Sequence, residues 1–308
     1  MGPWRNHLTN AKNIIESAGG IQVIAASPRS QAQLAMFSWY DRNSPSVTLV
    51  YIINKQPRWD CTLALLSRTP CVFPTRYYDY VLACDDENDS WDMFSLSGVP
   101  KNLFSHLVEL VQLANEKEKT AQMRWATFNM DRVFELEESI LEYSHQDMKP
   151  PLTEASEEAI QHWHDCCSGV DAWKYALLLY IARVFKWERK SSIRPVGMSS
   201  LARLTLDNVR CCRNTSMVQK QLLLPVFLAG SESDDSYSRM YVQEYCEHWF
   251  HRCRYRMFRD ASALMTEIWA ARDGGNRDAR AWWGSITDEK SRETEDADSG
   301  RLQEYLLG

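Results

Sequence analysis

The sequence predicts an all-α protein, built either as a multi-helix bundle or as an irregular stack of helix pairs. Apolar residues recur every three or four positions along most of the chain, which is the period of an amphipathic helix. The β-branched run from Val47 to Ile53 has no second strand pattern nearby, so a helix is expected there as well. The 12 tryptophans and the aromatic share of 11% favour the thick interior that packed helices enclose.

Length, charge and hydropathy exclude several function classes. The 308 residues, 44% of them apolar, suffice for a sizeable core in one large domain or two moderate ones. A net charge of −6 argues against a chain that grips nucleic acid by itself through phosphate neutralisation. The longest apolar run, Tyr175 to Ala182, is far shorter than the roughly 18 residues of a membrane span. The nine scattered cysteines and the polar start predict reduced thiols and an intracellular protein without a signal peptide.

The first hundred residues are the least regular part of the chain. The apolar residues Trp4, Leu8, Ala11 and Ile15 predict a first helix, which Gly19-Gly20 ends. A second apolar segment covers Leu34 to Tyr40. Between residues 55 and 100, several prolines and the acidic run Asp85 to Asp89 predict a long irregular region with at most one short helix.

From Pro100 onward the helical signals are clear. Proline suits the first turn of a helix, and an apolar stripe follows it at Leu103, Phe104, Leu107, Leu110, Val111 and Ala114. A second helix is marked by Phe134, Ile140 and Leu141 and stops before Pro150-Pro151. A third begins near Thr153 and Ser156, with acidic residues in its first turn. The segment from Asp171 to Trp187 is apolar on nearly every face, which predicts the central helix of a bundle.

The last third predicts four more helices and a polar tail. Leucines and Val209 mark a helix over residues 201–209, and Leu222 to Leu228 follows with Pro225 as a kink or a first-turn residue. Tyr241 to Met257 and Ala261 to Ala271 are amphipathic. The tail begins at Asp273-Gly274-Gly275, is dense in charge over 288–298, and can form a last short helix at Leu302 to Leu307.

Several side-chain constellations resemble functional sites, and a structural interpretation is favoured for each. His162 and Cys166 share a helix face, as zinc ligands do, but no second ligand pair lies nearby. Cys246 and Cys253 lie two helical turns apart, about 10 Å along the axis, which indicates a packed stripe rather than a redox pair. The acids after Gly230, namely Glu232, Asp234 and Asp235, predict a solvated turn or a helix cap rather than a calcium loop.

One predicted helix is locally basic, and the sequence contains few motifs that are typical of enzymes. The basic residues are His248, His251, Arg252, Arg254, Arg256 and Arg259; a solvated helix face is the favoured interpretation, and contact with a partner protein is the second. The sequence contains neither a glycine-rich phosphate loop nor a Gly-x-Ser-x-Gly motif. An enzyme would have to use an isolated titratable group such as His162 or Glu244.

The order of several motifs resembles a known family. The segment from Gln221 to Glu232 (QLLLPVFLAGSE) has an apolar run, a proline, more apolar residues and then Ala-Gly followed closely by an acid. Arg239 and then Glu267-Ile268-Trp269 follow it. Together with Trp4 to Gly20, Ser97 to Leu107 and Ala172 to Trp187, this order is similar to the second fungal-specific transcription factor domain family, the regulatory domain of fungal zinc-cluster transcription factors.

The resemblance implies an α-helical regulatory domain over residues 1–285, with 286–308 as a flexible polar tail. It implies a nuclear protein that controls RNA polymerase II transcription of a metabolite or drug-response gene set. The expected partners are a small apolar effector, coregulators or the transcription machinery, and a second copy in a homodimer. DNA would be contacted only through a zinc-cluster module, whose pattern begins Cys-x-x-Cys; no such pair occurs here, so the nine cysteines inherit no zinc role and no cofactor or metal is expected.

These implications predict a regulatory protein and not an enzyme, with an effector pocket inside the bundle. The pocket hypothesis rests on large rings that the helices turn inward, namely Trp173, Tyr180, Phe227, Tyr245 and Trp249. A plain core role for each ring is the alternative. Two further functions stay open at this point: a stand-alone enzyme of secondary metabolism on the same helical fold, and a dimerising modulator of intact regulators.

Overall fold

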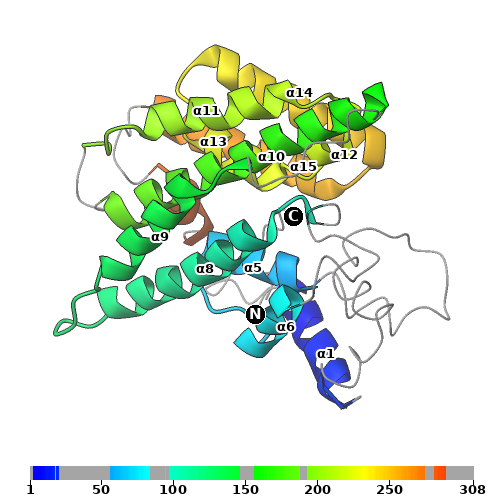
Figure 1. Ribbon diagram of the computed structural model, residues 1–308. Coiled ribbons are helices and arrows are strands. Elements are labelled where there is room, and N and C mark those ends of the chain that lie inside the picture. The colour runs from blue at the N-terminus through cyan, green and yellow to red at the C-terminus, as the bar shows by residue number, and fades with distance from the viewer. Residues whose placement is uncertain are drawn as a thin grey trace. The chain divides into compact units, whose positions relative to one another are not determined.

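The computed structural model describes residues 3–17, 19–20, 56–83, 94, 97–145, 156–187, 193–274 and 281–288 (Figure 1). These ranges are mostly helical and contain no strand, so the predicted all-α class is confirmed for them. They fall into two compact units, one within residues 1–115 together with 287–288 and the other within 116–286. None of the described helices combines the length and the hydrophobicity needed to cross a bilayer. The segments expected at 34–40, 47–53 and 289–308 lie outside the described residues.

The first unit contains α1 (Pro3–Ser17), α5 (Gln56–Ser67), α6 (Thr75–Ala83) and the first part of α8 (Lys101–Ala121). Leu8, Ala11 and Ile15 are buried on one face of α1, as their spacing predicts. The helix ends where expected, because Gly19 and Gly20 adopt φ values of +103° and +78° that other residues rarely tolerate.

The prediction of an irregular region over 55–100 is wrong for α5 and α6. The prolines flank these helices instead of interrupting them: Pro57 lies in the first turn of α5, while Pro70 and Pro74 lie in the connection. The buried carboxylate of Asp60 holds that connection in place. It accepts hydrogen bonds from the backbone N–H groups of Val72 and Phe73 at 2.8 and 2.7 Å, and from the Tyr78 hydroxyl at 2.7 Å.

In α8 and α9 (Asp131–Glu142) the structure confirms both predicted helices but revises one buried face. All members of the predicted α8 stripe are buried. In α9, Val133, Leu136 and Ile140 face inward, whereas Phe134 and Leu141 are about half exposed. Phe134 instead lies beneath the Lys186 ammonium, which also binds Glu137 at 2.5 Å. The tertiary partner of α9 therefore selects a face that the spacing of large apolar residues does not identify.

The longest helix of the second unit is α10 (Glu157–Ile181), which η3 (Ala182–Lys186) continues as one π-helical turn. Ser156 caps α10 by accepting a hydrogen bond from the Ala159 N–H at 3.3 Å, and acids occupy the first turn, as predicted. The half of α10 that follows Asp171 is almost entirely buried, which agrees with a central helix. The wider π turn ends with the Trp187 N–H bonded to the Ala182 carbonyl at 3.0 Å.

The next five helices along the described part of the chain include one short apolar helix, α13 (Leu223–Ser231), which the others surround. The others are α11 (Met198–Cys211), α12 (Met217–Lys220), α14 (Ser236–Cys253) and α15 (Arg256–Asp273). Every residue of α13 is buried, because α10, α11, α14 and α15 all pack against it (Figure 1). Pro225 lies in its first turn, which confirms the second of the two predicted alternatives. A two-residue connection folds α14 and α15 into an antiparallel hairpin.

Candidate functional site

The motif from Gln221 to Glu232 packs most closely against neighbouring helices at the C-terminal end of α13. A Cβ atom at Gly230 would lie 2.7 Å from Met265 Sδ and 2.9 Å from Val242 Cγ1. Glycine is therefore required here by the close approach of α13 to α14 and α15 rather than by an unusual backbone angle. The same close approach lets the Trp269 indole donate a hydrogen bond to the Gly230 carbonyl at 2.9 Å.

Arg239, the next residue of the motif, also returns to this point. Its Nε donates to the Ser233 carbonyl at 3.1 Å, and its guanidinium lies 5.4 Å from the centroid of the Trp269 ring. An ion pair with Asp273 at 2.6 Å completes its contacts at the surface. Residues that the motif spreads over 221–269 are thus brought together by the packing of α13 between α14 and α15.

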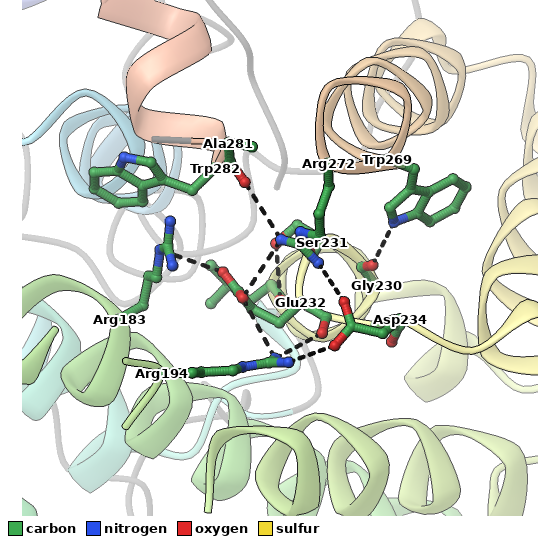
Figure 2. A network of polar contacts seen from close by, with 12 residues as sticks. Arg183, Arg194, Gly230, Ser231, Glu232, Asp234, Trp269, Arg272, Ala281 and Trp282 are labelled. Carbon is green, nitrogen blue, oxygen red and sulfur yellow. Dashed lines mark hydrogen bonds and ion pairs between the residues drawn. The ribbon is translucent and has the colours of Figure 1, made fainter. Parts of the chain in front are cut away.

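A buried carboxylate, Glu232, follows directly after α13 and attracts three arginines (Figure 2). Its Oε1 is 3.4 Å from Arg183 Nε, and its Oε2 is 3.5 Å from Arg194 Nη2 and 3.6 Å from Arg272 Nη2. Arg194 and Arg272 also form ion pairs with Asp234 at 2.6 and 3.0 Å. We call these five residues the arginine node.

Backbone carbonyls extend the arginine node to further segments. Arg194 donates to the Glu232 carbonyl at 2.7 Å, and Arg272 donates to the Ser231 carbonyl at 2.8 Å and to the Ala281 carbonyl at 3.4 Å. The node therefore joins η3, the stretch before α11, the end of α13, the end of α15 and the segment that begins at Ala281.

Arg183 is the arginine of the node whose charge is destabilised by burial. Its side chain is 4% exposed, and loss of solvation lowers the pKa of its guanidinium to about 10, an effect that the Glu232 charge partly offsets. The guanidinium lies over the rings of Trp187 and Trp282, at 4.0 and 4.8 Å from their centroids. Three cations and two anions leave an excess positive charge that the tryptophan faces stabilise.

The sequence interpretation of the acids after Gly230 is correct in one part and wrong in another. Asp235 is a helix cap, since its carboxylate accepts the Ser238 N–H at 2.7 Å and this bond lowers the pKa of Asp235. Asp234 is exposed, but Glu232 is buried and does not belong to a solvated turn. No local sequence pattern points to its arginine partners, which come from three separate segments.

The five residues of the predicted pocket are all buried in the helical core. Tyr180 stacks on Trp283 with ring centroids 6.0 Å apart. Tyr245 and Trp249 converge on Gln219: the tyrosine hydroxyl donates to its backbone carbonyl at 2.8 Å and the indole to its side-chain Oε1 at 3.1 Å. Trp173 and Phe227 lie on α10 and α13. An effector pocket lined by these rings stays a prediction.

A groove of about 520 Å³ runs between α14 and α15, and none of the five predicted pocket residues lines it. Its walls include Cys246, Phe250, Phe258 and Arg259. Burial raises the pKa of the Cys246 thiol to about 12, which makes it a poor nucleophile at neutral pH. The basic stretch predicted over 248–259 forms the end of α14 and the start of α15, beside this groove.

The remaining candidate constellations occupy structural positions. The His162 ring lies 3.6 Å from the Cys166 sulfur on the exposed start of α10, and the described residues contain no group of three or more potential ligands placed around a metal ion. The Cys253 thiol donates to the Trp249 carbonyl at 2.9 Å, whereas Cys246 is buried, in keeping with a packed stripe. Glu244 is exposed on α14.

Comparison with known proteins agrees with the motif order. The sequence model of the family described as "Fungal specific transcription factor domain" matches residues 1–294. That range includes both compact units except the last residues of the chain. No curated protein and no solved structure matches.

Proposed function

The chain belongs to the fungal specific transcription factor domain family, and from this premise we propose that it controls RNA polymerase II transcription in the nucleus by coupling an effector or a coregulator to the packing of its helices. Such a domain needs an element whose contacts can rearrange as a unit. The arginine node is the feature of the structure that best supports this role. It joins segments from η3 to residue 281 through charges that have alternative partners of their own.

The effector part of the proposal concerns the aromatic core. The rings of Trp173, Tyr180, Phe227, Tyr245 and Trp249 are all buried. A small apolar molecule that reaches them would have to displace core side chains, so it would bind a minor conformation and increase its population. The Trp173 indole N–H is buried and has no hydrogen-bond partner among the described residues. It is therefore the polar group that we expect to orient such a molecule. The gene set under control is proposed to serve metabolite production or drug response.

The partner part of the proposal concerns surfaces of the second unit. Coregulators or the transcription machinery would dock there, a second copy would form a homodimer, and contact with DNA would come from a zinc-cluster module outside this sequence. The family supports a role other than catalysis, and the raised pKa of Cys246 in the α14–α15 groove gives no support for a nucleophile there.

The test is a reporter assay with the full chain joined to an unrelated DNA-binding module in fungal cells. We expect reporter transcript to change about tenfold relative to the module alone, which corresponds to a coupling free energy of about 1.4 kcal/mol. Glu232→Gln should alter this output, whereas Glu135→Gln, at an exposed ion pair on α9, should not. Equal transcript with and without the chain, at equal protein abundance on immunoblots, would refute the proposal.

A further inference from the structure

The groove between α14 and α15 has an apolar floor and small side chains on one wall. Cys246 and Phe258 are buried, and Phe250 is partly exposed. On the α15 side, Ser262 and Ala263 leave space that larger residues would fill. The two helices of the hairpin form its walls. A helical segment with a narrow apolar stripe fits such a surface.

Four exposed arginines surround the end of this groove where α14 turns into α15. They are Arg252, Arg254, Arg256 and Arg259, and within the described part of the chain none of them forms an ion pair. This concentration is unusual in a chain whose net charge is −6. Two carboxylates lie nearby: Glu247, which lines the groove 3.6 Å from His251, and Asp260, which interacts electrostatically with Arg256 and Arg259. The four arginines outnumber them. The corner of the hairpin is therefore a local positive field on an acidic protein.

The guanidinium groups are held against aromatic faces. The Arg259 Cζ atom lies 4.7 Å from the centroid of the Phe250 ring, and Arg254 lies over the same ring at 5.9 Å. Arg252 lies 5.5 Å from the centroid of Trp249. A stacked guanidinium keeps its N–H edge free for a carboxylate and stays charged at every physiological pH. The pattern suits carboxylates that flank apolar side chains.

We propose that the α14–α15 groove is a docking site for an acidic amphipathic helix of a coregulator, with bulky apolar residues in the groove and carboxylates on Arg252, Arg254, Arg256 and Arg259. This inference rests on the proposed function, for which it supplies the partner chemistry. Nucleic acid would use the same arginines but would leave the apolar floor unused, so the combination of floor and charge favours the peptide.

The experiment measures fluorescence anisotropy with the full chain and a labelled synthetic peptide of about 14 residues, in which Leu and Phe follow helical spacing and Asp and Glu fill the other positions. A second peptide replaces every acid with its amide. The charge variant is Arg256→Gln with Arg259→Gln, and the groove variant is Ala263→Trp. Their matched controls are Arg203→Gln on α11 and Ala270→Trp, one heptad further along the exposed surface of α15.

We expect the acidic peptide to bind, and added salt to weaken it. The charge variant should weaken binding about tenfold, the groove variant at least as much, and the two controls less than twofold. The amide peptide should bind about as weakly as the acidic peptide binds the charge variant. Circular dichroism of each variant confirms that it is folded, so a loss of affinity reports the surface.

Three outcomes would overturn the inference. The first is no binding of the acidic peptide by the full chain, and the second is equal affinity for the acidic and amide peptides. The third is displacement of the peptide by a random DNA duplex of about 20 base pairs at lower concentration than the unlabelled peptide, which would assign the arginines to phosphate. If the reporter assay succeeds while the peptide fails, only the docking site is refuted, and the regulatory function stands.

Discussion

Replacement of Glu232 by Gln tests whether the arginine node stabilises the second unit. The substitution keeps the size and shape of the side chain, removes its charge and replaces one acceptor oxygen with an NH2 donor. Glu232 is 2% exposed, and its oxygens lie 3.4 to 3.6 Å from Arg183, Arg194 and Arg272. Arg194 and Arg272 keep Asp234 as a counterion in the variant, whereas Arg183 stays buried beside two other cations.

The expected loss follows from these distances and from burial. At 3.5 Å and an effective dielectric constant of about 20, one ion pair contributes roughly 5 kcal/mol of attraction. Desolvation of the charges and repulsion among the arginines offset most of the attraction summed over the three pairs. Removal of the buried carboxylate should therefore lower the free energy of unfolding by about 3–5 kcal/mol. Replacement of Asp234 by Asn, at a side chain that is 58% exposed, should lower the free energy of unfolding by about 1 kcal/mol or less.

The assay is urea unfolding followed by tryptophan fluorescence and circular dichroism, together with thermal melts. We expect Glu232→Gln to lower the melting temperature by roughly 10 °C and Asp234→Asn by only a few degrees. Adding Arg183→Met to Glu232→Gln should recover part of the loss, because it removes the uncompensated cation. The reasoning is refuted if the Glu232 and Asp234 variants lose the same stability, or if the Arg183 change deepens the loss.

Three further substitutions test the packing and the caps. Gly230→Ala should lower the free energy of unfolding by about 1–3 kcal/mol in urea titrations, because the new Cβ would contact Met265 Sδ at 2.7 Å; unchanged stability would show that the helices separate freely. Asp235→Ala should cost about 1 kcal/mol at pH 7. The Ser238 N–H lowers the pKa of Asp235 in the folded protein, so the stability from the cap is complete above the unfolded pKa of 3.8 and is lost as pH falls through the folded pKa. Wild type and variant should therefore converge in stability in acid, and a constant difference down to pH 2 would contradict this. Asp60→Ala leaves two backbone N–H groups and one hydroxyl without their acceptor and should cost about 2–4 kcal/mol, with early amide exchange at Phe73; protection equal to wild type there would rule out the clamp.

Several helix ends follow from local sequence in both units. Ser156 and Asp235 cap helices through bonds to residues three positions ahead, and Gly19-Gly20 ends α1 through its own backbone angles. Each of these interactions joins residues that are neighbours in the chain, so the residue types alone predict it. The order of longer motifs, led by the segment from Gln221 to Glu232, sufficed to identify the family.

Local signals failed where a distant partner decides the outcome. The prolines near α5 and α6 predict a loop, but Asp60 binds the N–H groups of Val72 and Phe73 and fixes a tight helix-to-helix connection. Phe134 has the spacing of a core residue, yet it is half exposed, because α9 presents Val133 and Ile140 inward.

Residue patterns along the chain are enough to predict that it is helical, that α13 is apolar throughout, and that an acid follows Gly230. The packing of the helices, in contrast, buries Glu232 and brings Arg183, Arg194 and Arg272 to it. Helix formation depends on contacts three or four residues apart, whereas the partner of a long, charged side chain depends on which helix ends the packing brings within a few ångströms of it.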